Sequence, residues 1–170
     1  PYMGTRVWRN FLKSDPSVDL IHMTVLRTAD KNDNTPKQEL SLIPFPTREL
    51  FEEKLNNFQL VIFDNFKGKN ILSPLYYENI LSFVKKGGAI LEITGPSYNS
   101  RDSLFRTAIG AILPGAPTGK VIKSEFKPTL SEIGKIHPIT KSLFNNFKNY
   151  GSWFEMNKIT DIDDRALTLL

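Results

Sequence analysis

The chain has 170 residues, of which 22 are Lys or Arg and 18 are Asp or Glu, so its formal net charge is +4 at neutral pH. Hydrophobic residues make up 40% and charged residues 24%, average values that exclude collagen, coiled coils and disordered chains. Basic residues are scattered among acidic ones, so nucleic acid is not expected as a partner. The length suits one domain spanning residues 1–170.

The sequence contains no cysteine, which excludes disulfides, thiolate zinc sites and a cysteine nucleophile. No apolar run reaches the roughly 18 residues needed to cross a bilayer, and no signal-peptide pattern opens the chain. We expect a soluble domain, either cytoplasmic or the soluble part of a membrane protein. The chain opens without Met and ends in an apolar run, so we expect an excised or truncated part of a longer protein.

The first third of the chain predicts a helix and a strand. Apolar residues at helical spacing over 7–12 predict a helix that ends before Pro16. The apolar, β-branched run 18–26 predicts a strand that is buried on both faces, with His22 as a core histidine. A polar loop, 28–37, follows.

The middle of the chain alternates strands with helices. Residues 60–63 predict a short buried strand, and Ser73-Pro74 begins a helix that ends at Lys86-Gly87. The apolar stripe of this helix consists of Tyr77, Ile80, Leu81 and Val84. A strand at 89–93, a helix over 104–109 and a separate strand at 121–126 come next. This alternation predicts an α/β fold with a mostly parallel sheet.

A candidate binding site follows from that topology. Strands joined by one crossover helix are usually neighbours, so the loops after strands 60–63 and 89–93 should converge. In open α/β sheets, ligands bind beyond the carboxyl ends of the strands. We expect a shallow polar pocket there for a small polar or anionic ligand. Its predicted binding residues are Asp64, Asn65, Gly95, Ser97 and Tyr98.

Ser97 and His137 are the candidate catalytic residues. Gly95-Pro96-Ser97 lies where a strand turns into a helix, the context of a nucleophile elbow, although Asn99 replaces the second glycine of that motif. Ser97 either caps the following helix or acts as a nucleophile. His137 is the credible base for such a nucleophile, or else it fixes its own loop by bonding to the backbone.

The remaining acidic residues predict no metal site, and no cofactor is expected. Asp161, Asp163 and Asp164 resemble the start of a calcium loop but lack its glycine and distal glutamate, so they predict a solvated turn. Asp64 either starts a turn or points into the crevice. Glu92 lies inside an apolar strand and must be paired or at the sheet edge, because a buried unpaired charge costs several kcal/mol.

Six segments of the chain together carry a family resemblance. They are 11–20 (FLKSDPSVDL), 26–28 (LRT), 39–46 (ELSLIPFP), 61–65 (VIFDN), 83–89 (FVKKGGA) and 137–140 (HPIT). In this order they resemble the class I glutamine amidotransferase-like family, bacterial domains related in fold to the trehalose-utilisation family. The resemblance covers most of residues 5–140, and its most specific part is LSLIPFP, residues 40–46.

This resemblance implies a flavodoxin-like three-layer sandwich. Members occur alone or within membrane-anchored proteins, sometimes beside von Willebrand factor A modules. Class I amidotransferases use an elbow cysteine, served by a histidine and an acid, but Ser97 stands at that place here. Glutaminase activity is therefore not expected. The departed elbow and the presence of two histidines favour a pseudoenzyme that binds a ligand or a protein partner within a larger bacterial envelope protein; the alternative is a serine hydrolase using Ser97 with His137.

Overall fold

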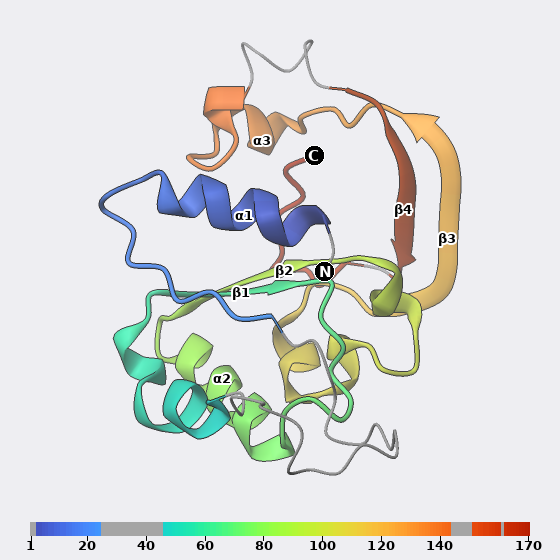
Figure 1. Ribbon diagram of the computed structural model, residues 1–170. Helices are drawn as coiled ribbons and strands as arrows, with labels where there is room; N and C mark the ends of the chain where they lie inside the picture. Colours follow the sequence, from blue (N-terminus) through green and yellow to red (C-terminus); the bar gives the residue numbers. More distant parts are fainter. Residues whose placement is uncertain (1–2, 25–45, 144–150, 161) are drawn as a thin grey trace. The chain divides into compact units, whose positions relative to one another are not determined.

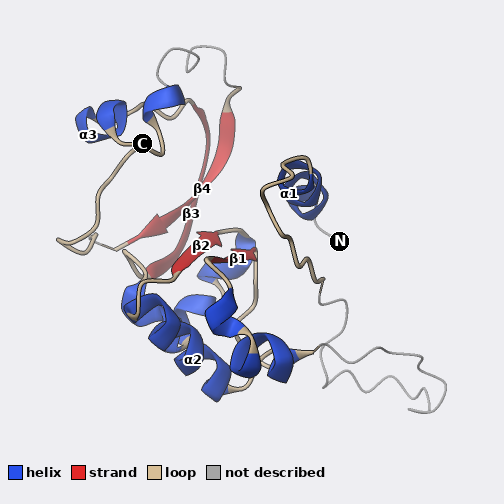
Figure 2. Cartoon of the chain, turned by 90° about the vertical axis from the view of Figure 1, so that its left-hand side faces the viewer, coloured by secondary structure: helices blue, strands red, loops and turns tan. Residues whose placement is uncertain are grey.

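The computed structural model describes residues 3–24, 46–143, 151–160 and 162–170. They belong to two compact units, Pro1–Ala111 and Ile112–Leu170. Both helices and strands are present, and one of the two sheets is parallel, so the fold is mixed α/β, as the sequence predicts (Figure 2). Within these described residues, no helix is long and apolar enough to cross a lipid bilayer.

The first unit contains the predicted strand, crossover helix and strand. Strand β1 (Leu60–Asp64) pairs in parallel with β2 (Ala89–Ile93), in a continuous register from Leu60 opposite Ala89 to Asp64 opposite Ile93. Helix α2 (Pro74–Lys85) connects them and packs against β2 (Figure 1). Because the strands are parallel, the loops that follow them leave from the same edge of the sheet.

Helix α2 confirms its prediction at both ends. Ser73 has the extended backbone of an N-cap, although its side chain makes no capping hydrogen bond, and Pro74 is the first helical residue. Gly87, at φ +105°, ends the helix in a conformation that L side chains rarely adopt. Tyr77 and Ile80 are buried, as expected. Leu81 and Val84 are only half-buried, and Phe83, which lies outside the predicted stripe, is the third buried residue of the helix.

The core of the first unit extends beyond α2. A π-helical turn, Glu49–Glu53, and a 3₁₀ helix, Leu55–Asn57, precede β1. Their apolar side chains turn inward, and α2 packs against both turns. The buried apolar residues of this unit are Leu50, Phe51, Leu55, Phe63, Leu72, Tyr77, Ile80, Phe83, Tyr98, Leu104 and Ile109.

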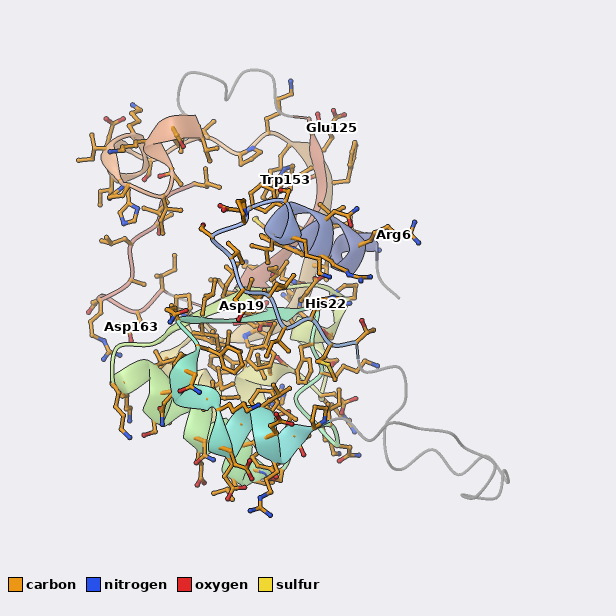
Figure 3. The ribbon with its side chains drawn as sticks, turned by 60° about the vertical axis from the view of Figure 1, so that its left-hand side comes forward. Arg6, Asp19, His22, Glu125, Trp153 and Asp163 are labelled. Atoms are coloured by element: carbon orange, nitrogen blue, oxygen red, sulfur yellow. The ribbon has the colours of Figure 1, made fainter. Side chains whose placement is uncertain are left out.

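The predicted strand 18–26 is wrong over its described part. Helix α1 (Met3–Lys13) confirms the preceding helix, but residues 18–24 are irregular, with Ile21 50% exposed; residues 25–26 lie outside the described residues. His22 therefore lies on an irregular segment and is half-buried rather than in a core strand (Figure 3). A β-branched run favours a strand only where a neighbouring strand pairs with it, because strand propensity depends on context.

The predicted helix 104–109 is also wrong. Two 3₁₀ helices, Leu104–Arg106 and Ala108–Ile112, take its place, and a third, Pro96–Asn99, precedes them. The Ser103 hydroxyl accepts a hydrogen bond of 3.2 Å from the Phe105 amide, and the Thr107 hydroxyl donates one of 2.7 Å to the Leu104 carbonyl. Such local bonds compete with the hydrogen bonds of a continuous α-helix.

The second unit contains an antiparallel pair of strands. Strand β3 (Pro117–Phe126) confirms the strand predicted at 121–126, and its partner β4 (Trp153–Ile159) was not predicted. The Phe126 and Trp153 rings meet edge to face with centroids 6.0 Å apart.

A short helix, α3 (Glu132–Ile136), was also not predicted. The hydroxyl of its N-cap, Ser131, accepts a bond of 2.9 Å from the Gly134 amide. The end of the chain passes close to α3, since a Cβ on Gly134 would lie 2.0 Å from the Leu169 carbonyl oxygen.

Candidate functional site at the carboxyl ends of β1 and β2

The structure brings together the loops that leave β1 and β2. Asn65 follows β1, and its amide donates a hydrogen bond of 2.9 Å to the Ile93 carbonyl at the end of β2. Gly95 and Ser97 lie in the loop after β2, and both contact the Asn65 side chain. The candidate site therefore centres on Asn65, Gly95 and Ser97, with Asp64 and Tyr98 as their chain neighbours.

The Asn65 side chain caps the 3₁₀ helix Pro96–Asn99 from the neighbouring loop. Its Oδ1 accepts one hydrogen bond of 2.7 Å from Ser97 Oγ and a second of 3.3 Å from the Ser97 amide. Asn65 has a φ of +46°, a conformation that asparagine tolerates better than most residues. Ser97 is thus the donor in this cap, which corrects the prediction that the serine caps the helix itself.

Gly95 makes room for this contact. Its backbone is extended, with φ −131°, so the conformation itself does not require glycine. A Cβ at this position, however, would lie 2.3 Å from Asn65 Oδ1, far inside van der Waals contact. The glycine of the elbow therefore allows the two loops to approach, rather than allowing a strained turn.

Ser97 is buried beside two hydrogen-bond acceptors of its own unit. The residue is only 7% exposed. Its Oγ donates to Asn65 Oδ1, and the Phe66 carbonyl oxygen lies 3.4 Å away. An amide oxygen and a carbonyl oxygen accept a hydrogen bond but do not remove the proton, as an activating base must.

His137 belongs to the second unit and is engaged by its own loop. Its amide donates to the Ile133 carbonyl at 2.9 Å, which ends α3, and its ring Nδ1 accepts a bond of 3.3 Å from the Ile139 amide. This geometry matches the loop-fixing alternative for His137. The partner that the structure assigns to Ser97 is Asn65.

Glu92 carries a buried carboxyl group near the candidate site. It lies opposite Phe63 in the β1–β2 register and so shares the face of the sheet on which Phe63 is buried. Its Oε2 atom is inaccessible and has no hydrogen-bond partner among the described residues. Burial, and after it the charge of Asp64, raise the pKa of Glu92 to about 7. The sequence required Glu92 to be paired or at the sheet edge, and among the described residues β2 is an edge strand of a two-stranded sheet, which matches the second alternative.

Tyr98 fills the space beside this carboxyl. Its side chain is 4% exposed, and its ring meets that of Phe105 edge to face with centroids 6.4 Å apart. Burial raises the pKa of Tyr98 to about 12, and the Glu92 charge contributes. With Ser97 and Tyr98 both buried, the crevice is packed with side chains, and Asp64, Asn65 and Gly95 are its half-buried surface.

A hollow that the sequence did not predict lies at the opposite ends of the same strands. It has a volume of about 250 Å³. Its lining residues are Asn56, Phe58, Gln59, Phe83, Lys86, Gly87 and Gly88. The signal in the sequence was Gly87-Gly88, since a Cβ on Gly88 would lie 2.2 Å from the Phe83 ring.

The acidic segment near the end of the chain forms an exposed turn where it is described; Asp161 lies outside the described residues. The Asp163 carboxylate accepts hydrogen bonds from the Arg165 side chain at 2.9 and 2.7 Å, which lowers the pKa of Asp163 (Figure 3). Among the described residues, no group of three or more His, Asp or Glu side chains is arranged to hold a metal ion.

The chain was compared with protein-family models, curated proteins and solved structures. The resemblance to class I glutamine amidotransferases stays a prediction from the sequence. No protein-family model, no curated protein and no solved structure matches this chain.

Proposed function

We propose that the chain is a non-catalytic class I glutamine amidotransferase-like module that binds a small polar or anionic ligand or a protein partner. In this proposal the domain has a flavodoxin-like three-layer sandwich and belongs to a larger bacterial envelope protein. The order β1, α2, β2 and the elbow-like loop after β2 support the fold assignment. The observation that carries the function is the 2.7 Å hydrogen bond from Ser97 Oγ to Asn65 Oδ1.

In this proposal, that hydrogen bond gives Ser97 a structural role instead of a catalytic one. An elbow nucleophile must be exposed and must touch a base, whereas Ser97 is buried and bonded to an amide oxygen. The sequence also lacks the cysteine that amidotransfer requires. The half-buried Asp64, Asn65 and Gly95 remain as the surface that a ligand contacts.

An activity test separates this proposal from the serine hydrolase. The purified chain and its Ser97→Ala variant are treated with a fluorophosphonate probe and with ester, amide and glutamine substrates. We expect no labelling and no turnover above the buffer rate for either protein. Labelling or turnover that is present in the wild type and absent in Ser97→Ala would establish the hydrolase instead.

A binding test addresses the ligand. Phosphate, sulfate and glutamine are titrated separately into ¹⁵N-labelled protein, and amide chemical shifts are followed. We expect the amides of Asn65 and Gly95 to shift with at least one of these probes. Shifts confined to Gly87 and Gly88 would place the ligand in the opposite hollow and reject the proposed site.

A further inference from the structure

Four cationic residues lie where the segment after β1 meets the segment after β2. They are Lys67, Lys69, Arg101 and Arg106, and together they form what we call the basic cluster. All four residues are exposed. Within the described ranges, none of them forms an ion pair. Neighbouring like charges repel one another, so an anion placed among them would be stabilised.

Backbone contacts hold the two segments of the basic cluster together. An antiparallel bridge joins Lys67 to Ser103. Gly68, the next residue, is buried, and a Cβ there would lie 3.1 Å from the Ser103 carbonyl oxygen. Because the two segments run in opposite directions, Lys69 and Arg101 follow at the same end of the bridge.

Hydrogen bonds through Ser100 connect the basic cluster to the candidate site. The Ser100 hydroxyl donates a bond of 2.7 Å to the Ser97 carbonyl, and Arg106 Nε donates one of 3.4 Å to the Ser100 carbonyl. The Arg106 guanidinium therefore lies beside Ser100, which is the chain neighbour of Arg101. Both arginines of the basic cluster thus belong to the loop that carries the candidate site.

The charge of this region suits an anion that carries more than one negative charge. Asp102 is the acidic residue within segments 67–69 and 100–106, it is half-buried, and it forms no ion pair with a described residue. Even with its carboxylate ionised, the two segments keep an excess of positive charge. A phosphate monoester carries about −1.5 to −2 charges at pH 7 and three acceptor oxygens. Arginine binds such oxygens in pairs, and lysine acts on them as a point charge.

We propose that the basic cluster binds the phosphate group of a small phosphate monoester, whose uncharged part extends to Asn65 and Gly95. The inference rests on the proposed function, because it names the ligand class of that same site. The phosphate contacts Lys69, Arg101 and Arg106 in this arrangement. The place of the site agrees with the general position of ligands beyond the carboxyl ends of parallel strands.

Titration of ¹⁵N-labelled protein with glycerol 3-phosphate tests the inference, with glycerol and inorganic phosphate titrated separately. We expect saturable shifts of the Lys69 and Arg101 amides with both phosphates and none with glycerol. The amides of Asn65 and Gly95 should shift further with glycerol 3-phosphate than with inorganic phosphate. Binding should weaken as the NaCl concentration rises, because salt screens exposed charges, and this readout needs no variant.

Substitutions then assign the contacts. Lys69→Gln and Arg101→Gln should each weaken the binding of glycerol 3-phosphate about tenfold or more, since each removes a charged hydrogen-bond donor. The matched control is Lys85→Gln, which removes an exposed cation at the end of α2 and changes the net charge equally. Its dissociation constant should equal that of the wild type.

The outcomes separate this inference from the proposed function. Titrations without saturable shifts at Lys69 and Arg101 would overturn the phosphate site, as would equal weakening in Lys85→Gln. Binding to vesicles that contain phosphatidic acid, with no binding of glycerol 3-phosphate, would also overturn it, because the ligand would then be a lipid surface. Shifts at Lys69 and Arg101 without any at Asn65 and Gly95 would support the phosphate site and reject the site of the proposed function.

Discussion

Ser97 Oγ and Asn65 Oδ1, 2.7 Å apart, join the two loops that leave the parallel strands. The same Asn65 oxygen accepts the Ser97 amide and occupies the space that a Cβ on Gly95 would need. One side chain therefore explains why the loop after β2 has a glycine and a serine at these positions. The elbow resembles a nucleophile site in sequence because both need a glycine close to a serine.

Removing the Asn65 side chain should destabilise the chain. Asn65→Ala leaves the Ser97 hydroxyl and amide without their acceptor, at a cost of about 1–3 kcal/mol in the free energy of unfolding, measured by urea denaturation. Asn70→Ala is the matched control, because Asn70 also has a positive φ, +61°. This variant measures the free-energy cost of placing alanine at a positive φ. Equal losses in the two variants would show that the hydrogen bonds contribute nothing.

Replacing Gly95 should damage the same contact. Gly95→Ala brings a Cβ against Asn65 Oδ1 without straining the backbone, whereas Gly87→Ala strains a positive φ but meets no atom within 4 Å. We expect Gly95→Ala to cost more than the roughly 1 kcal/mol typical of such strain. In a double-mutant cycle, Gly95→Ala should cost less once Asn65 is already alanine. Additive losses would contradict the contact.

The buried face of α2 gives a test of the core. Ile80 is fully buried, so Ile80→Ala should lower the free energy of unfolding by about 2–5 kcal/mol. Leu75 is 53% exposed on the same helix, and Leu75→Ala should change it by only about 0.5 kcal/mol. A denaturation midpoint that is the same for both variants would mean that α2 presents another face to the core.

The sequence predicts the parts of this fold that depend on local signals. Helix α2 has a cap residue, Pro74, an apolar stripe and Gly87, all within 15 residues, and these signals agree. Strand β4 pairs with residues 27 to 42 positions away, from Phe126 opposite Trp153 to Pro117 opposite Ile159, and its side chains are mostly exposed, so neither burial nor spacing identifies it. The run at 18–24 shows the converse, because an apolar pattern does not supply the partner that a strand requires.

The sequence predicts where the candidate site lies, but not its hydrogen bonds or the protonation of its side chains. Parallel pairing of neighbouring strands brings Asn65 close to Ser97, which follows from topology. The direction of their hydrogen bond depends on the positive φ of Asn65 and on side-chain rotamers, which no sequence pattern gives. The protonation of Glu92 depends likewise on the burial of its carboxyl by neighbouring elements.

The Tyr77 hydroxyl donates a hydrogen bond of 2.5 Å to the Gly68 carbonyl. The Gly68 amide in turn donates to the Asp102 carbonyl at 2.6 Å, so the loop before α2 is fixed from both sides. Tyr77→Phe keeps the ring but leaves this buried carbonyl unpaired, at about 1–3 kcal/mol in the free energy of unfolding. Tyr76→Phe, on the half-exposed side of α2, keeps its packing near Phe51 and is the control, with an expected change of about 0.5 kcal/mol or less.

The same variant should alter stability at high pH. Burial raises the pKa of Tyr77 from 10.0 to about 12, so the folded state holds the phenol proton more tightly than the unfolded chain does. The contribution of Tyr77 to stability is therefore fully present below pH 10 and is lost as the pH rises towards 12. Between these values the midpoint of urea unfolding should fall less steeply in Tyr77→Phe than in the wild type or in Tyr76→Phe. Tyr98, with a similarly raised pKa, and Lys54, whose pKa is raised by its hydrogen bond to Glu49, contribute to the slope that remains. Identical slopes in all three proteins would show that the Tyr77 phenol ionises as freely in the folded chain as in the unfolded one.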